Sequence, residues 1–327
     1  MLLQQLLLGS LVVGSLIYLV VHLGHGDRGQ VVCSTEDTSR LASDTVQANQ
    51  GVSHEQRGDG VYRVHLVQQL PHAIIIGVRK GGTRALLEML DLHPTVVTAS
   101  QEVHFFDNDE NYEQGFAWYR SRMPHSPIDH VTIEKSPAYF TTEKVPERIF
   151  GMNASVKLLV IVREPVTRAV SDYAQVLEGK LRKNKTYPSF ESLAIDSTTD
   201  RVNTKYKAVS TSIYTKHLER WLHFFPAQQI HLVDGDLLIS DPLPELQMVE
   251  RFLNLPPCIG RDHLYFNSTR GFYCLRSGQH RGTRCLAGSK GRRHPSVHPA
   301  VLHTLRLFFH PYNQKLYQIT GRTFSWP

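Results

Sequence analysis

A short apolar run that leads through glycines into a helix constrains this chain more than any other feature of its sequence. Residues 73–78 read Ala-Ile-Ile-Ile-Gly-Val, which is typical of a strand buried within a parallel sheet. The sequence Arg-Lys-Gly-Gly-Thr-Arg follows, and residues 85–90 then have helical character. Glycines allow the backbone to approach an anion closely, and the start of a helix offers free N–H groups. The pattern therefore predicts a phosphate-binding loop with contacts from Lys80, Gly81, Gly82, Thr83 and Arg84.

The residue order in this loop differs from that of the Walker A motif. There the lysine follows the last glycine of G-x-x-x-x-G-K-[ST], whereas Lys80 precedes both glycines. Residues 230–234, Ile-His-Leu-Val-Asp, resemble a Walker B strand that ends in an aspartate. A nucleotide kinase with magnesium-dependent ATP turnover is therefore an alternative, although the position of Lys80 argues against it.

Strand and helix patterns alternate over the rest of the chain. Further strands are predicted at 131–134, 157–162 and 229–233, and further helices at 165–178, 212–225 and 243–253. Such alternation with short connections implies an α/β domain with a central parallel sheet flanked by helices. In these sheets ligands bind beyond the carboxyl ends of the strands. Residues 71–327 are predicted to form this single domain.

A second strand, loop and helix provide another anion site. Arg163 ends the strand at 157–162, and Ser171 lies about two turns into the next helix. Together with the glycine loop they suggest a nucleotide with phosphates at both ends. That is the shape of 3′-phosphoadenylyl sulfate (PAPS).

Charge is distributed unevenly along the chain. No Asp or Glu follows Asp262, whereas ten Lys and Arg residues do. This asymmetry indicates a polyanionic ligand, whether nucleic acid, a phosphorylated cofactor or an acidic polysaccharide.

The N-terminal region indicates a secretory-pathway protein. Residues 1–23 are almost wholly apolar and match the ~20 residues that span a bilayer as a helix. A signal anchor and a cleaved signal peptide are both consistent with them. Residues 24–70 are rich in Gly, Ser, Thr, Gln and Asp and are predicted to form a flexible lumenal stem.

Cysteines and glycosylation motifs agree with that compartment. Cys274 and Cys285 lie close together in an irregular stretch, where a disulfide would close a short loop. A zinc site is the alternative, weakened by the lack of C-x-x-C spacing. Asn153, Asn184 and Asn267 each begin an Asn-x-Ser/Thr triplet and are candidate glycosylation sites.

Several ordered motifs resemble the heparan sulfate glucosamine 3-O-sulfotransferases. The resemblance covers roughly residues 71–327 and is closest to the type 1 enzyme. It is carried by residues 74–90, Glu102-Val-His-Phe-Phe-Asp107, Glu134-Lys-Ser-Pro-Ala-Tyr139, Gly271-Phe-Tyr-Cys274, Lys290-Gly-Arg292 and Gly321-Arg-Thr-Phe324.

The resemblance implies a P-loop-like sulfotransferase fold and transfer of a sulfuryl group from PAPS to the 3-hydroxyl of glucosamine. It implies a heparan sulfate or heparin chain, and not nucleic acid, as the partner. It also implies a Golgi location with a lumenal catalytic domain. Transfer to another position of heparan sulfate is the alternative within this class.

The chemistry assigns roles to residues of these motifs. Glu102 is the predicted general base for the hydroxyl proton, with His104 and Asp107 orienting it or the acceptor. Lys80 is predicted to stabilise the charge that develops on the leaving phosphate. Lys135 is predicted to face the saccharide or the transferred group. Because Lys and Arg can replace the Mg²⁺ of kinases here, no metal is expected.

The resemblance adds two further sets of contacts. The C-terminal basic segment is predicted to bind PAPS through Lys290, Gly291, Arg292, Arg293 and His294. The acceptor is predicted to contact Val103, Phe105, Phe106, Asn108, Ser136, Pro137, Ala138, Tyr206 and Lys207. A non-catalytic heparan-binding protein that uses only its basic tail is the remaining alternative, and it would need neither the glycine loop nor Glu102.

Overall fold

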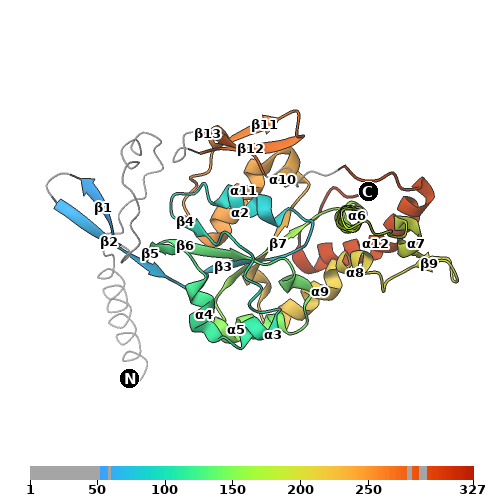
Figure 1. Ribbon diagram of the computed structural model, residues 1–327, viewed down its shortest axis with the longest axis horizontal. Coiled ribbons are helices and arrows are strands. Elements are labelled where there is room, and N and C mark those ends of the chain that lie inside the picture. Colours follow the sequence, from blue (N-terminus) through green and yellow to red (C-terminus); the bar gives the residue numbers. More distant parts are fainter. Residues whose placement is uncertain (1–51, 58–59, 278–281, 287–292) are drawn as a thin grey trace, which may run out of the picture. The chain divides into compact units, whose positions relative to one another are not determined.

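The computed structural model describes residues 52–57, 60–277, 282–286 and 293–327. Its centre is a five-stranded, all-parallel sheet with the strand order β10-β7-β3-β6-β4 (Figure 1). The strands are β3 (Ala73–Gly77), β4 (Val96–Thr98), β6 (Val131–Lys135), β7 (Lys157–Val162) and β10 (Ile230–Asp234). The predicted fold class is therefore confirmed.

Helices cover both faces of this sheet, which explains why its central strand is apolar throughout (Figure 1). Ile74 and Ile76 of β3 pack with α4 (Gly115–Ser121), α5 (Val145–Met152) and α9 (Tyr214–Leu222). Ala73 and Ile75 face the other way, toward α2 (Thr83–Leu90) and α11 (Pro242–Leu253). The alternation of side chains along β3 thus divides the core into two layers.

A third apolar cluster lies among α6 (Pro165–Leu181), α7 (Phe190–Ala194), α8 (Lys207–Thr211) and α12 (Pro299–Thr320). At its edge Arg168 of α6 is fully buried and pairs with Asp172 at 3.0 Å. Its guanidinium also donates to the carbonyl oxygens of Arg79 and Ala208. Because a buried charge must be paired and hydrogen-bonded, Arg168 fixes α6 against α8 and against the start of the glycine loop.

The helix predicted over 212–225 starts in the wrong place. The structure has α8 up to Thr211 and a new helix, α9, from Tyr214. Between them the Ser212 hydroxyl donates to the carbonyl oxygen of Pro165 at 2.9 Å and accepts from Arg168 at 2.6 Å. These tertiary bonds favour a break that hydrophobic spacing alone does not reveal.

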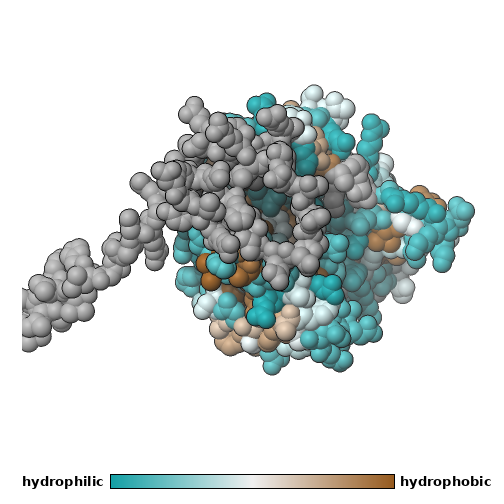
Figure 2. All heavy atoms as spheres, turned by 60° about the vertical axis from the view of Figure 1, so that its left-hand side comes forward, coloured by the Kyte–Doolittle hydropathy of each residue, from teal (hydrophilic) through white to brown (hydrophobic). Residues whose placement is uncertain are grey.

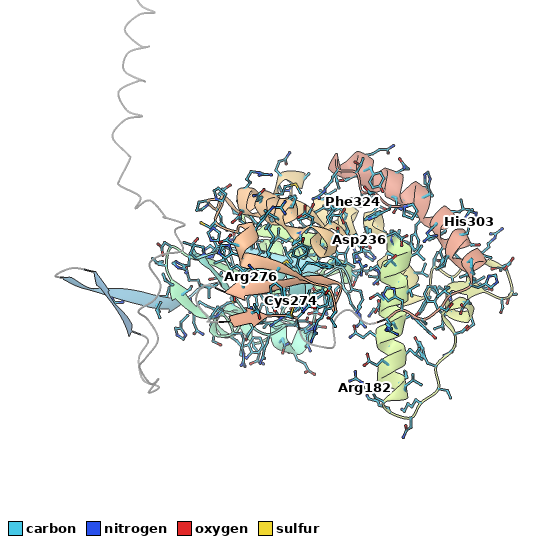
Figure 3. All side chains as sticks on the ribbon, turned by 90° about the horizontal axis from the view of Figure 1, so that it is seen from above. Arg182, Asp236, Cys274, Arg276, His303 and Phe324 are labelled. Carbon is cyan, nitrogen blue, oxygen red and sulfur yellow. A yellow bond between two sulfur atoms is a disulfide. The ribbon has the colours of Figure 1, made fainter. Side chains whose placement is uncertain are left out.

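A small antiparallel sheet carries the predicted disulfide. It contains β11 (Leu264–Asn267), β12 (Phe272–Ser277) and β13 (Gly282–Arg284). Cys274, which lies on β12 beside Arg276 in Figure 3, is bonded to Cys285. The disulfide prediction is confirmed, and the zinc alternative loses both of its ligands.

The remaining described elements are short. They are α3 (Asp109–Tyr112), α10 (Leu237–Ser240), the hairpin of β8 (Ile195–Asp196) and β9 (Arg201–Val202), and the 3₁₀ turns at Tyr139–Thr141, Ala227–Gln229 and Arg261–His263.

The predicted flexible stem differs from the structure in its last third. Val52–Arg57 forms β1 and Gly60–Gln68 forms β2, and the two strands pair antiparallel. β2 also pairs with β5 (His125–Pro127), which joins this segment to the domain. The sequence of β2 is rich in β-branched and aromatic residues, which favour strands.

The apolar segment at 1–23 and most of the predicted stem lie outside the described residues. Among the helices of the described part, none is both long and apolar enough to cross a membrane. Of the predicted glycosylation sites, Asn153 and Asn184 are exposed. Asn267 is half-buried, and its side-chain amide contacts the sulfur of Cys285 at 3.7 Å.

Candidate active site

A cavity of about 730 Å³ lies at the carboxyl ends of β3, β6 and β7. Its wall includes Lys80, Glu102, Lys135, Arg163 and His294, which come from five separate segments of the chain. The position agrees with the rule that parallel sheets bind ligands beyond the carboxyl ends of their strands. The cavity wall is rich in cationic side chains, and the coloured surface in Figure 2 is mainly hydrophilic.

The glycine loop forms one side of the cavity, and steric limits explain its glycines. A Cβ atom on Gly81 would lie 2.3 Å from the carbonyl oxygen of Ile161 in β7. Gly82 precedes α2 with a φ of 122°, a conformation that side chains disfavour. Lys80 also has a positive φ, 71°, and its ammonium donates to the Gln175 side chain of α6 at 3.1 Å. The chain therefore presents Lys80 and the first turn of α2 to the cavity.

Arg163 lies at the end of β7, as predicted, and its position is fixed by charge. Its guanidinium pairs with Asp236 at 2.9 Å, and the same carboxylate accepts the N–H of Glu164. Asp236 follows β10 (Figure 3). Ser171 of α6 lines the same part of the cavity. The structure therefore brings the two predicted anion-binding loops together.

The acidic loop after β4 forms another part of the wall. The Glu102 carboxylate pairs with the Lys135 ammonium at the end of β6 and lies 3.4 Å from Nε2 of His104. His104 Nδ1 contacts Asp107 at 2.9 Å. Burial raises the pKa of Glu102, but the hydrogen bond and charge of Lys135 and the charge of His104 outweigh it, so the net shift is downward. Glu102 is therefore a carboxylate at neutral pH, held between Lys135 and His104.

The electrostatics of His104 complement those of Glu102. Burial lowers the pKa of His104, but the hydrogen bond and charge of Asp107 and the charge of Glu102 raise it overall. The result is a chain of polar contacts that runs from Lys135 through Glu102 and His104 to Asp107. Such a chain holds the carboxylate in one orientation at the cavity wall.

A smaller hollow of about 270 Å³ adjoins this cavity and shares Arg79, Pro137 and Ala138 with it. Tyr206 and Lys207, the predicted acceptor contacts, line this hollow. The shared residues make the two hollows neighbours, so an extended ligand can reach both.

Several predicted acceptor contacts do not reach the cavity wall. Phe105 and Phe106 are fully buried, and Phe105 stacks on Tyr119 with ring centres 4.5 Å apart. Ser136 is also fully buried. Val103 is half-buried, and Asn108 is exposed and accepts the Asn111 N–H at the start of α3. Because Phe105, Phe106 and Ser136 are buried and do not line the cavity, their side chains support the loop from behind.

The C-terminal basic segment is described only in part. Lys290, Gly291 and Arg292 lie outside the described residues. Arg293 is exposed, and His294 lines the cavity. Burial lowers the pKa of His294, and the charges of Arg163 and Lys80 lower it further. His294 therefore lies close to both predicted anion-binding cations.

Sequence reasoning missed other residues of the wall. Gln175, the partner of Lys80, lies four residues after Ser171 and thus on the same face of α6. Arg270, Phe272 and Tyr273 also line the cavity. Phe272 and Tyr273 belong to the Gly-Phe-Tyr-Cys motif, and Arg270 directly precedes it. That motif supported the family resemblance but was not used to predict site residues.

The geometry gives no support to the kinase alternative. Asp234, at the end of the Walker B-like strand, accepts the N–H groups of Asp236 and Leu237 at 2.9 and 3.1 Å. Its carboxylate therefore stabilises the turn that follows β10. Within the described ranges, no group of three or more His, Cys, Asp or Glu residues could hold a metal ion.

Comparison with known proteins agrees with the fold. Residues 70–320 match the family model of the sulfotransferase domain. A solved sulfotransferase from Alicyclobacillus acidocaldarius has the same fold, with a TM-score of 0.59 and 18% identity over 79% of this chain and 98% of that chain. The family match and the fold thus define a sulfotransferase.

Sequence relatives identify the family. Heparan sulfate glucosamine 3-O-sulfotransferase 5 of Mus musculus is 64% identical over 336 residues, which cover 99% of this chain and 97% of that protein. The human protein of the same name is 65% identical over 338 residues. Mouse heparan sulfate glucosamine 3-O-sulfotransferase 3B1 is 48% identical over 79% of this chain and 65% of that protein. The chain belongs to the heparan sulfate glucosamine 3-O-sulfotransferase family.

These identities correct one prediction. The resemblance was expected to be closest to the type 1 enzyme, whereas the full-length likeness at 64–65% identity is to isoform 5. The motifs at 74–90, 102–107, 134–139 and 271–274 all contribute residues to the cavity wall, and they indicated the family.

Proposed function

We propose that the cavity binds PAPS and a heparan sulfate chain, and that Glu102 removes the proton from the glucosamine 3-hydroxyl during sulfuryl transfer. One observation carries this proposal. The carboxylate of Glu102 and the cations of the two anion-binding loops line the same cavity at the carboxyl edge of the sheet. A base, a donor site and space for an acceptor are thereby combined.

The donor side is assigned to the two loops. The glycine loop, with Lys80, Thr83 and Arg84, would hold the phosphosulfate end, and Arg163 with Ser171 would hold the 3′-phosphate. His294 and the predicted residues Lys290 to Arg293 would close this side. The adjoining hollow with Tyr206 and Lys207 would receive the continuing saccharide chain.

The chemistry follows from the charges in the cavity. The hydroxyl oxygen attacks sulfur as its proton passes to the Glu102 carboxylate, and the bond between sulfur and the bridging oxygen of PAPS breaks. Negative charge then develops on the leaving phosphate, where the Lys80 ammonium stabilises it. Lys135 and His104 keep Glu102 ionised before the transfer. The reaction needs no metal in this scheme, since Lys and Arg supply the positive charge.

The family also supports a cellular setting. We place the reaction in the Golgi lumen, with the apolar segment at 1–23 serving as a membrane anchor or as a cleaved signal peptide. Asn153 and Asn184, both exposed, are the better placed of the three glycosylation motifs.

The first experiment tests the reaction itself. The full-length protein is incubated with heparan sulfate and with PAPS that carries radioactive sulfate. The heparan sulfate is then digested to disaccharides for mapping. We expect label on the 3-oxygen of glucosamine. Label only at another position, or ATP turnover that depends on magnesium, would overturn the proposal.

A second experiment tests the base. Glu102→Gln keeps the shape of the side chain and removes its basicity, so kcat should fall by about 10²-fold or more. Binding of PAPS, measured by calorimetry, should stay within about threefold. Glu110→Gln, an exposed carboxylate on α3, is the matched control and should leave both unchanged. A Glu102→Gln variant with kcat within about threefold of wild type would exclude Glu102 as the base, and His104 would be tested next.

Arg163→Ala separates binding from chemistry. Because Arg163 is assigned to the 3′-phosphate, far from the transferred group, its loss should raise the KM for PAPS more than it lowers kcat. An effect on kcat alone would contradict this assignment.

A further inference from the structure

Three successive N–H groups in the loop that carries Glu102 are bound by side chains from the end of β6 and from the residues just after it. The N–H of Val103 points to Oε1 of Glu134 at 3.5 Å. The N–H of His104 donates to the Ser136 hydroxyl at 3.1 Å, and the N–H of Phe105 donates to the Tyr139 hydroxyl at 2.9 Å. A single short segment, 134–139, thus satisfies the backbone of the loop residue by residue.

Glu134 is the centre of this arrangement. Its side chain is completely buried, as are those of Ser136 and Tyr139. The Ser136 hydroxyl, which accepts from His104, donates in turn to Oε1 of Glu134 at 2.5 Å. The Tyr119 hydroxyl donates to Oε2 at 3.2 Å. Both carboxyl oxygens are therefore engaged, and Glu134 connects α4 and β6 to the loop.

The loop needs this support because its backbone is strained. His104 has a φ of 52°, in the left-handed region that costs a non-glycine residue of order 1 kcal/mol or more. Such a conformation persists only where surrounding contacts fix it. This conformation places the His104 ring 3.4 Å from Glu102, so the strain serves the site directly.

We propose that Glu134 is a positioning residue, which acts through Ser136 and the backbone of Val103 and His104 to hold the Glu102 carboxylate at the cavity wall. Glu134 does not itself line the cavity and so touches no reacting atom. This inference rests on the proposed function, because it assigns to Glu134 the support of the base.

The proposal predicts different values of kcat for two substitutions of Glu134. Glu134→Gln keeps an oxygen that accepts from Ser136 and Val103, and the Tyr119 hydroxyl can turn to accept from the new amide. Its kcat should stay within about threefold of wild type. Glu134→Ala removes every acceptor, so the loop relaxes and kcat should fall about tenfold or more, since even ~1 Å of misplacement can cost ~10²-fold. The KM for PAPS should change less than about threefold in both.

Glu245→Ala controls for the loss of a buried carboxylate. Glu245 is also completely buried, accepts the N–H of Asp234 and pairs with Arg322, far along the chain from the acidic loop. Its removal should lower the melting temperature, while kcat per folded molecule stays within about twofold of wild type. A shared loss of stability then cannot explain a loss of kcat seen only in Glu134→Ala.

Ser136→Ala provides a second test if Glu134→Ala does not fold. It removes the acceptor of the His104 N–H while Glu134 remains, so kcat should again fall with little change in the KM for PAPS. Equal kcat in Glu134→Ala and Glu245→Ala, or a Glu134→Gln variant as slow as Glu134→Ala, would overturn the inference. If no Glu134 variant folds, wild-type kcat in Ser136→Ala would overturn it. Glu102→Gln, measured in parallel, separates failure of this inference from failure of the proposed function. Full activity of Glu102→Gln would overturn the proposed function, whereas the Glu134 and Ser136 variants test only the inference.

Discussion

The glycine loop and the acidic loop line the same cavity but are built in opposite ways. The glycine loop follows β3 directly, and its cations and glycines are contiguous from Lys80 to Arg84. Its conformation follows from close backbone contact, since Gly81 lies against the Ile161 carbonyl oxygen. In the acidic loop, the functional residues Glu102, His104 and Asp107 are separated by other residues. Side chains from 134–139 fix the conformation of this loop.

This difference teaches where each kind of site is vulnerable. A loop held by backbone contact fails when a side chain is added, and one held by side chains fails when a side chain is removed. The donor site should therefore be sensitive to the loss of glycine, and the base to the loss of its hydrogen-bonding partners.

Among the variants that test this comparison, the largest effect is expected for Gly81→Ala. The added methyl would lie 2.3 Å from the Ile161 carbonyl oxygen and 2.9 Å from that of Val78, so the loop must move away from β7. We expect affinity for 3′-phosphoadenosine 5′-phosphate, the desulfated product, to fall about tenfold or more in calorimetry. Gly179→Ala on α6 is the matched control, because nothing lies within 4 Å of the added Cβ. Wild-type affinity in Gly81→Ala would show that backbone contact does not shape the donor site.

A smaller effect is expected for Lys135→Met, which keeps the apolar stem and removes the charge. Lys135 lowers the pKa of Glu102, so its loss should raise that pKa. The base works only when deprotonated, so the acid limb of the kcat profile should move to higher pH, and activity at low pH should fall. Rates between about pH 4 and pH 8 measure this shift.

Lys144→Met is the control for Lys135→Met. Lys144 pairs with Asp109, outside the cavity wall, so its removal should leave the profile in place. An unchanged acid limb in Lys135→Met would mean that Lys135 does not set the ionisation of Glu102.

The smallest effect on the site is expected from removal of the disulfide. Cys274→Ser with Cys285→Ser reopens a loop whose closure is worth about 3 kcal/mol in the chain-entropy model. We expect a melting temperature several degrees lower, with affinity for the desulfated product within about threefold of wild type. Equal melting temperatures would contradict a stabilising role, and a large loss of affinity would show that the β11–β13 sheet also shapes the donor site.

The fold was largely predictable because its signals are local. The apolar runs at 73–78 and 157–162 are buried strands, and their hydrophobic pattern is independent of the rest of the chain. The break at Ser212 was not predictable, because it depends on hydrogen bonds to Pro165 and Arg168, more than forty residues away. The pairing of β2 with β5 was missed for the same reason.

The sequence by itself determined the parallel sheet, the glycine loop, Arg163 at a strand end and the residue types of the acidic loop. These depend on contiguous patterns, and the carboxyl ends of parallel strands necessarily meet at one edge. The tertiary structure alone decided which residues near Glu102 face the cavity and which support it. Phe105 and Phe106 lie close to the base in sequence and Ser136 follows Lys135, yet all three are buried. Burial and hydrogen-bond partners depend on segments that are distant in the chain. The role of Glu134 therefore follows only from the tertiary structure, in which the end of β6 contacts the acidic loop.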